Sequence, residues 1–230
     1  GRVTPQGAYE RKWSVIAFAL AFAESRVAAD DAQARRIAAW LRDIGDRVTV
    51  HYMGTPTSGI SDRANNHAYW AALSAAAVGL AAGDADQFDW GMERFKAALD
   101  DIDAEGFLAL ELARASKALH YHRFSLEPLL LLGLIARTNG VVVPSASLQA
   151  LRRLAIRVRS GLEDPTPFVA RTGKRQELVG GDSSTRGDWA WAELDLVLNP
   201  DAALAARIAP ARPYVARWLG GDLTLRYARP

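Results

Sequence analysis

The 230-residue chain has no cysteine and no long hydrophobic run, and each absence excludes a class of protein. Without cysteine there are no disulfide bonds, no thiolate metal sites and no cysteine nucleophile. The first apolar stretch, Trp13 to Ala23, is ended by Glu24 and Arg26, short of the roughly 18 residues that a membrane span needs. The opening Gly1–Pro5 lacks the pattern of a signal peptide. We therefore expect no membrane span and no signal peptide in this chain.

Neither sign of charge dominates, because 28 lysines and arginines face 26 aspartates and glutamates, and the isoelectric point is near 9.0. Such a surface tolerates a polyanionic partner without requiring one. The densest basic cluster is Arg152, Arg153, Arg157 and Arg159. Its spacing is that of a solvated helix face and not of a basic arm, so we expect no nucleic-acid partner.

Strand signals are scarce, whereas apolar residues recur at helical spacing along most of the chain. The predicted helices cover residues 7–26, 30–44, 64–82, 86–102, 108–118, 120–137, 145–162, 187–197 and 202–208. Short segments with strand character are Val48–Tyr52, Val141–Val143 and Leu223–Tyr227. Glycine and proline predict a loop at Gly54–Gly59 and a long irregular connection at Asp164–Thr185.

The fold class is therefore all-α, and we expect one helical domain over residues 1–230. Long helices with one apolar face must pack pairwise, as a bundle, a solenoid or a closed toroid. The absence of a repeat with fixed period disfavours a regular solenoid.

The first segment that carries chemistry is Asn65-Asn66-His67-Ala68-Tyr69-Trp70, at the start of an alanine-rich helix. Two amides, an imidazole and two aromatic rings are unusual where a helix interior favours small apolar residues. His67 and Trp70, three residues apart, share a helix face. An N-cap followed by a hydrogen-bonded core histidine is the alternative explanation.

The second segment, Arg114 to Phe124, is dense in titratable groups between two leucine-rich stretches. If it is helical throughout, Arg114 and Tyr121 lie on one face, because seven residues make about two turns. A basic exposed face with aromatic packing is the alternative. His120 and His122 diverge by about 200° on a helix, so only one of them can face the same side as Tyr121. We expect no metal site, since HExxH is also absent.

Hydrolytic chemistry has weaker support. The chain has no G-x-S-x-G elbow for a serine nucleophile. A glycosidase needs two carboxylates, and the pairs Asp100/Asp101 and Glu111/Glu127 have no supporting chemistry around them.

Three segments together resemble one known family. They are Asn65-Asn66-His67-x-Tyr69-Trp70, then Leu110-Glu111-Leu112-Ala113-Arg114 followed by Ala118-Leu119-His120-Tyr121-His122, and upstream Gln6-Gly7-x-Tyr9-x-Arg11-Lys12-Trp13. Their order and content are similar to those of the mannuronate-specific alginate lyases of polysaccharide lyase family 5. The resemblance runs from residue 6 to about residue 140, and more faintly through Gly187-Asp188-Trp189.

The resemblance implies an (α/α) toroid or incomplete helical barrel with a central cleft. It further implies a periplasmic or secreted enzyme without cofactor or metal. Its partner would be alginate, an anionic polysaccharide, cleaved at poly-β-D-mannuronate by β-elimination to give 4,5-unsaturated uronate ends.

The four central residues of that family match Asn66, His67, Arg114 and Tyr121. The resemblance makes the first three the groups that stabilise the uronate carboxylate as it becomes enolate-like. Tyr121 would take the C5 proton and protonate the departing O4. The pKa of a free phenol is about 10, so its anion needs Arg114 or a protonated His67 nearby. Whether His67 shares the role of base stays open.

Four further residues are candidates for substrate binding: Trp13, Tyr69, Trp70 and His120. The three aromatic residues can stack on sugar rings, and packing in the core is the alternative for them.

The chain begins close to the Gln6-Gly7 motif, whereas the family carries an N-terminal basic lid. We therefore expect the lid to be lacking. Two alternative functions stay open. One is a lyase for another polyuronate such as polyglucuronate, and the other is a non-catalytic polyuronate-binding or alginate-secretion protein.

Overall fold

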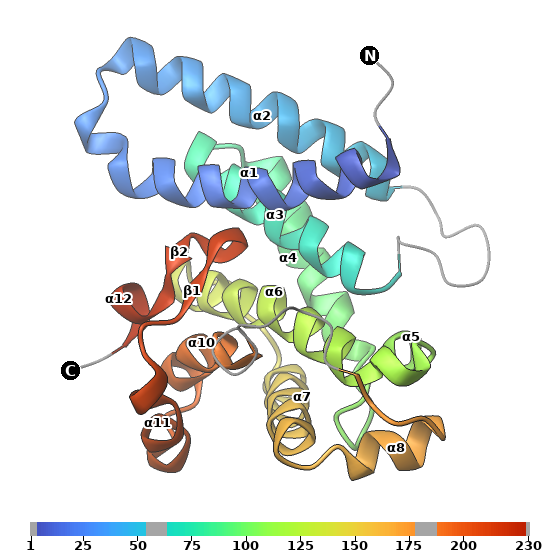
Figure 1. Cartoon of the computed structure of the whole chain (residues 1–230). Helices are drawn as coiled ribbons and strands as arrows, with labels where there is room; N and C mark the ends of the chain where they lie inside the picture. Colours follow the sequence, from blue (N-terminus) through green and yellow to red (C-terminus); the bar gives the residue numbers. More distant parts are fainter. Residues whose placement is uncertain (1–3, 54–63, 178–187, 229–230) are drawn as a thin grey trace. The chain divides into compact units, whose positions relative to one another are not determined.

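The computed structural model describes residues 4–53, 64–177 and 188–228 (Figure 1). Compactness divides the chain into two units, one made of Gly1–Phe95 with Arg217–Gly221 and the other of Lys96–Ala216 with Asp222–Pro230. The single domain over residues 1–230 stays a prediction. Among the described residues, no helix has the length and apolar character needed to span a membrane.

Helices dominate both units. The first unit holds α1 (Pro5–Ser25), η1 (Arg26–Ala28), α2 (Asp31–Met53), α3 (Asn66–Ala82), most of α4 (Ala85–Asp100) and η4 (Arg217–Leu219). The second unit holds α5 (Ala109–Leu112), η2 (Ala115–Lys117), α6 (Ala118–Thr138), α7 (Ser145–Glu163), α8 (Thr166–Thr172), α10 (Trp191–Leu198), α11 (Ala202–Ile208), η3 (Ala209–Ala211) and α12 (Leu223–Tyr227). Two short strands, β1 (Val215–Ala216) and β2 (Gly221–Asp222), pair with each other.

In the first unit α1, α2 and α3 pack against one another (Figure 1). Helix α3 is buried on nearly all sides, which explains its many alanines, since small side chains let neighbouring helices approach closely. Asn65 caps its N-terminus, and Gly83 ends it in the left-handed conformation. Helix α4 approaches α3 at Gly91, where an added Cβ would lie 2.7 Å from the backbone atoms Ala72 O and Ala76 N.

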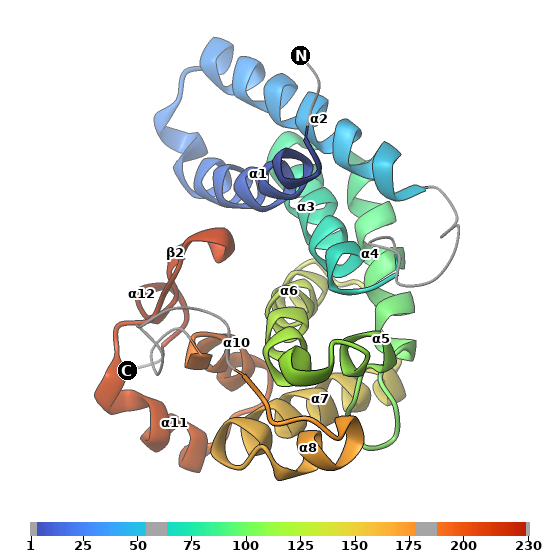
Figure 2. The ribbon, with the colours of Figure 1, turned by 45° about the vertical axis from the view of Figure 1, so that its right-hand side comes forward.

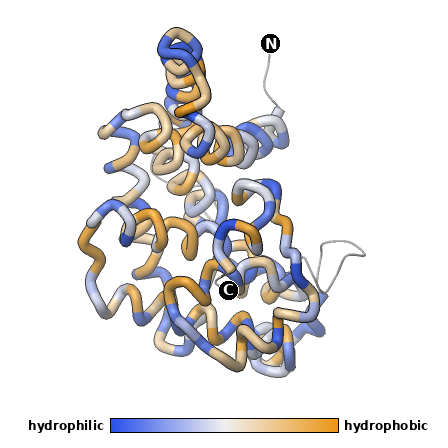
Figure 3. The backbone as a smooth tube through the Cα atoms, turned by 90° about the vertical axis from the view of Figure 1, so that its left-hand side faces the viewer, coloured by the Kyte–Doolittle hydropathy of each residue, from blue (hydrophilic) through white to orange (hydrophobic). Residues whose placement is uncertain are grey.

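In the second unit α6 is the central helix, and α5, α7, α8 and α10 all pack against it (Figure 2). It is buried over almost its whole length after Phe124. Its first turn contributes Ala118 and Leu119 to a core cluster with Phe107 and Phe168. Figure 3 shows hydrophilic and hydrophobic residues mixed along much of the tube, as expected where helices have one apolar face.

The helix predicted over residues 108–118 is wrong, because α5 ends at Leu112 and the backbone turns before η2. Ala115 has φ 54°, in the left-handed region that helices avoid. Gln176 holds this turn through its side chain. Its Nε2 donates to Ala115 O at 3.1 Å, and its Oε1 accepts from Leu119 N at 3.0 Å. These tertiary bonds replace the bonds that a continuous helix would make.

None of the three short segments with strand character forms a strand. Val48–Tyr52 lies in α2, Leu223–Tyr227 forms α12, and Val141–Val143 has no regular structure. Helix α12 begins because the Asp222 side chain accepts a hydrogen bond from Leu225 N.

The two predicted loops fall partly or wholly on undescribed positions. Gly54–Gly59 and the last part of Asp164–Thr185 lie outside the described residues. The first part of that connection contains α8, so the prediction of an entirely irregular segment is wrong there. Prolines at the start of α8 suit its first turn, where no backbone N–H is needed.

Candidate active site

The first turn of α3 carries His67. The Asn65 side chain accepts a hydrogen bond from His67 N at 3.0 Å, so the N-cap of the alternative explanation is present. Asn66 follows as a buried residue, and His67 is only partly buried. The cap therefore fixes the backbone of His67, and with it the direction in which its imidazole projects from α3.

Next to His67 lies Lys12 of α1, whose side chain is fully buried. Its Nζ is 2.8 Å from Tyr52 Oη and 2.8 Å from His67 Nδ1. The same atom is 4.6 Å from the ring centroid of Tyr9 and 5.2 Å from those of Trp13 and Tyr52. Electron-rich ring faces attract a cation, so three rings and two hydrogen bonds stabilise this buried ammonium.

Aromatic rings extend from His67 across α1 to η4. Tyr9 stacks on His67 with ring centroids 4.2 Å apart and an interplanar angle of 27°. Trp13 lies parallel to His67 at 6.2 Å and contacts Trp218 at 5.9 Å. Both tryptophans are partly exposed, so this wall is suited to stacking on sugar rings.

Tyr69 and Trp70 do not belong to this wall. Tyr69 is 4% exposed and Trp70 is completely buried. Burial favours the alternative explanation, which is packing in the core, and the stacking role predicted for these two residues is corrected accordingly.

In the second unit the Arg114 guanidinium lies over the ring of Tyr121, with Cζ 4.7 Å from the ring centroid. The expected pairing is therefore present, although the continuous helix from which it was predicted is not. Arg114 stands at the N-cap of η2, and its Nε is 3.7 Å from a carboxylate oxygen of the buried Glu111. The turn held by Gln176 thus places a cation on the face of Tyr121.

His120 and His122 have different neighbours: His120 contacts Tyr121, whereas His122 is hydrogen-bonded to backbone atoms. The ring of His120 meets that of Tyr121 edge to face at 5.1 Å and stacks with Phe124 at 6.3 Å. Burial lowers the pKa of His120 to about 4, and the positive charges of Arg123 and Lys117 add to that shift. His120 is therefore a neutral ring beside Tyr121 at ordinary pH.

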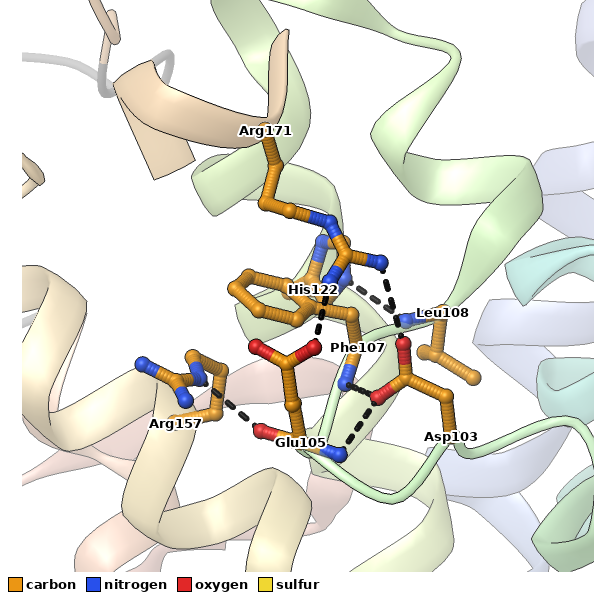
Figure 4. Close-up of polar contacts among 7 residues, drawn as sticks. All are labelled: Asp103, Glu105, Phe107, Leu108, His122, Arg157 and Arg171. Atoms are coloured by element: carbon orange, nitrogen blue, oxygen red, sulfur yellow. Dashed lines mark hydrogen bonds and ion pairs between the residues drawn. The ribbon is translucent and has the colours of Figure 1, made fainter. Parts of the chain in front are cut away.

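His122 instead has a structural role (Figure 4). Its Nε2 accepts from Leu108 N at 2.9 Å, and its Nδ1 lies 2.7 Å from Ala118 O. Burial lowers its pKa to about 4, with Ala118 O opposing the shift. It anchors the loop before α5 to the first turn of α6.

Charged side chains around Phe107 stabilise this loop before α5 (Figure 4). The guanidinium carbons of Arg157 and Arg171 lie 4.5 and 4.8 Å from the Phe107 ring centroid. Asp103 accepts from the backbone N–H of Phe107 at 2.8 Å and pairs with Arg171 at 3.3 Å. These contacts support the segment that leads into the Arg114 turn.

The carboxylates Glu111 and Glu127, considered for hydrolysis, each pair with an arginine of their own segment. Glu127 accepts from Arg123 at 2.7 Å, and Arg123 also lies 3.4 Å from Asp188. Burial raises the pKa of Glu127 to about 7, although Arg123 opposes the shift. This pairing is that of a buried ionic cluster and gives a glycosidase mechanism no support.

The predicted site residues thus fall into two groups. In the first unit Trp13 contacts His67, and in the second unit Arg114, Tyr121 and His120 cluster together. Within the described ranges, no group of three or more histidines or carboxylates is arranged to hold a metal ion.

Lys12, Tyr52 and Trp218 also contact this candidate site, although the sequence did not point to them. Lys12 stands inside the Gln6–Trp13 motif, which was the available signal for it. Tyr52 and Trp218 come from distant parts of the chain, and no local pattern marks them.

Comparison with known proteins relates most of the chain to one family. The family model described as Alginate lyase matches residues 8–168. The chain is 39% identical to an alginate lyase of Azotobacter chroococcum mcd 1 and 35% identical to one of Pseudomonas fluorescens. These alignments cover 93% and 94% of this chain but 58% and 59% of the relatives. The chain therefore spans about three fifths of their length.

Solved structures show the same relationship at the level of fold. Alginate lyase A1-III from Sphingomonas species A1 matches with a TM-score of 0.83 at 24% identity, over 98% of this chain and 63% of that chain. A variant of alginate lyase A1-III complexed with tetrasaccharide also has a TM-score of 0.83, at 23% identity, over 100% of this chain and 65% of its own. The expectation of an all-α, (α/α) toroid fold is thereby confirmed.

Proposed function

The chain belongs to the alginate lyase family, and we propose that it carries the catalytic residues of a lyase that cleaves alginate at mannuronate by β-elimination. The observation that carries this proposal is the Arg114 guanidinium over the partly exposed Tyr121 ring. Elimination from a uronate needs a base close to a group that stabilises the developing negative charge, and Arg114 places a cation beside Tyr121.

In the proposed reaction the Tyr121 phenolate takes the proton from C5 of the uronate. The electron pair of that C–H bond forms the C4=C5 double bond, and the C4–O4 bond breaks. The O4 leaving group then receives the proton from Tyr121, so one residue serves as base and acid. This suits mannuronate, in which the C5 proton and O4 lie on the same side of the ring.

The negative charge that builds on the uronate carboxylate must be stabilised as the proton leaves. We assign this role to Asn66, His67 and Arg114, which supply amide, imidazole and guanidinium donors. His120, which contacts Tyr121, is assigned to substrate binding.

The aromatic wall of the first unit is assigned to the polymer. Trp13 and Trp218 offer partly exposed rings 5.9 Å apart, and sugar rings stack on such faces. The relatives are named alginate lyases, and a structural relative is complexed with tetrasaccharide, which supports an anionic polysaccharide as partner. A periplasmic or secreted location is part of the same proposal.

The experiment follows ultraviolet absorbance while the protein is mixed separately with polymannuronate, polyguluronate and polyglucuronate. Elimination creates an absorbing 4,5-unsaturated uronate, whereas hydrolysis creates none. A rise with polymannuronate alone is the expected result. A rise with polyglucuronate alone would reassign the substrate, and silence with all three, together with binding by calorimetry, would overturn catalysis in favour of a polyuronate-binding or secretion protein.

A further inference from the structure

Lys12 has no role in the proposed reaction, but its ammonium directly contacts the imidazole of His67. We propose that Lys12 is a positioning residue that fixes the tautomer of His67, with the ring proton on Nε2 and a lone pair on Nδ1. The inference rests on the proposed function only for its consequence in catalysis, since the tautomer can be measured without substrate.

The chemistry of the two groups sets the tautomer. An ammonium has three donors and no acceptor, so the 2.8 Å contact between Lys12 Nζ and His67 Nδ1 requires Nδ1 to accept. In the neutral ring the proton is then on Nε2. An imidazolium would direct a second N–H at the ammonium, which is unfavourable in both hydrogen bonding and charge.

The position of Lys12 is held from several sides. It donates to Tyr52 Oη at 2.8 Å, its side chain is completely buried, and the rings of Tyr9, Trp13 and Tyr52 surround its ammonium. Stacking of Tyr9 on His67 fixes the plane of the imidazole at the same time. Neither partner of the Lys12–His67 bond is therefore free to rotate away.

This tautomer decides whether His67 can share the role of base, which the sequence left open. With its proton on Nε2 and its Nδ1 lone pair engaged by Lys12, His67 acts as a hydrogen-bond donor through Nε2. It can stabilise the uronate carboxylate but has no lone pair left for the C5 proton. Lys12 thereby assigns the base role to Tyr121 alone.

The test is nitrogen NMR of the ¹⁵N-histidine-labelled protein at neutral pH, with the four histidines assigned by single substitution. His122 is an internal reference of the opposite kind, because Leu108 N donates to its Nε2 and Ala118 O accepts from its Nδ1. We expect His67 to show the Nε2–H tautomer and His122 the Nδ1–H tautomer. An Nδ1–H tautomer or an imidazolium at His67 in the unsubstituted protein would overturn the proposal.

Lys12→Met removes the donors while keeping a similar side-chain length. We expect the His67 signals to move to a mixture of both tautomers, with His122 unchanged, and kcat on polymannuronate to fall about tenfold or more. Lys174→Met, at an exposed lysine, is the matched control and changes neither readout. A His67 that stays fully in the Nε2–H form in Lys12→Met refutes control by Lys12.

Tyr52→Phe keeps the proposal testable if Lys12→Met fails to fold. This variant removes one partner of Lys12 but leaves the Lys12–His67 bond, so the Nε2–H tautomer should persist. Its loss would show that Lys12 alone does not set the tautomer. Absence of lyase activity with the tautomers as expected would refute the proposed function and leave this inference intact.

Discussion

Glu127 provides a stability test that is independent of catalysis. Burial raises the pKa of this carboxyl from 4.5 to about 7, Asp188 adds to the shift, and Arg123 opposes it. The folded state therefore binds the proton more tightly than the unfolded state does. This contribution to stability is fully present below about pH 4.5 and is lost as pH rises through about 7.

The magnitude follows from the two pKa values. Each pH unit between them corresponds to about 1.4 kcal/mol, which makes the contribution about 3 kcal/mol. The glutamine of Glu127→Gln cannot ionise, so the stability of this variant does not lose that contribution as pH rises. The free energy of unfolding of Glu127→Gln, relative to that of the unsubstituted protein, should therefore rise by about 3 kcal/mol between pH 4.5 and pH 8.

The assay is urea unfolding followed by tryptophan fluorescence at both pH values. Comparing the two pH values cancels any constant cost of the substitution, including an altered hydrogen bond to Arg123. Glu93→Gln, on an exposed face of α4, is the control and should show no such rise. A difference that stays constant, or one that falls with pH because the ion pair to Arg123 dominates, would refute the reasoning.

Three further predictions concern packing and the site. Gly91→Ala places a methyl group 2.7 Å from backbone atoms of α3 and should lower the free energy of unfolding by about 1 to 3 kcal/mol in urea titrations; an unchanged midpoint would contradict it. Gln176→Ala releases the turn that holds Arg114, so kcat on polymannuronate should fall while the circular dichroism spectrum is kept, and full activity would count against the clamp. Glu193→Gln removes the charge of a buried carboxylate that lies 2.7 Å from the partly exposed Arg212 and should cost about 1 to 3 kcal/mol in thermal unfolding, whereas unaltered stability would show that the pair contributes little.

Most helices of this fold are predictable because local signals mark them. Asn65 and Gly83 bracket the alanine-rich helix, and the structure places its cap and its end at these residues. The turn at Ala115 is different, since Gln176, far along the chain, holds it by hydrogen bonds that no local pattern encodes. Tertiary contacts override helical propensity at that point.

The candidate site shows the same division. Arg114 and Tyr121 can be paired from sequence, although by way of a helix that the structure does not contain. The contact of Lys12 with His67 joins α1 to α3, and a lysine in an amphipathic helix ordinarily indicates a solvated face. Its complete burial among aromatic rings is a property of packing, and only the structure reveals it.

The most direct test of the central claim compares the unsubstituted protein with Tyr121→Phe in the ultraviolet assay on polymannuronate. Tyr227→Phe in α12 is the control for loss of a phenolic hydroxyl elsewhere in the chain. We expect Tyr121→Phe to lower kcat by about 100-fold or more with unchanged folding, and Tyr227→Phe to retain activity. Unsaturated product formed by Tyr121→Phe at the unsubstituted rate would contradict this expectation.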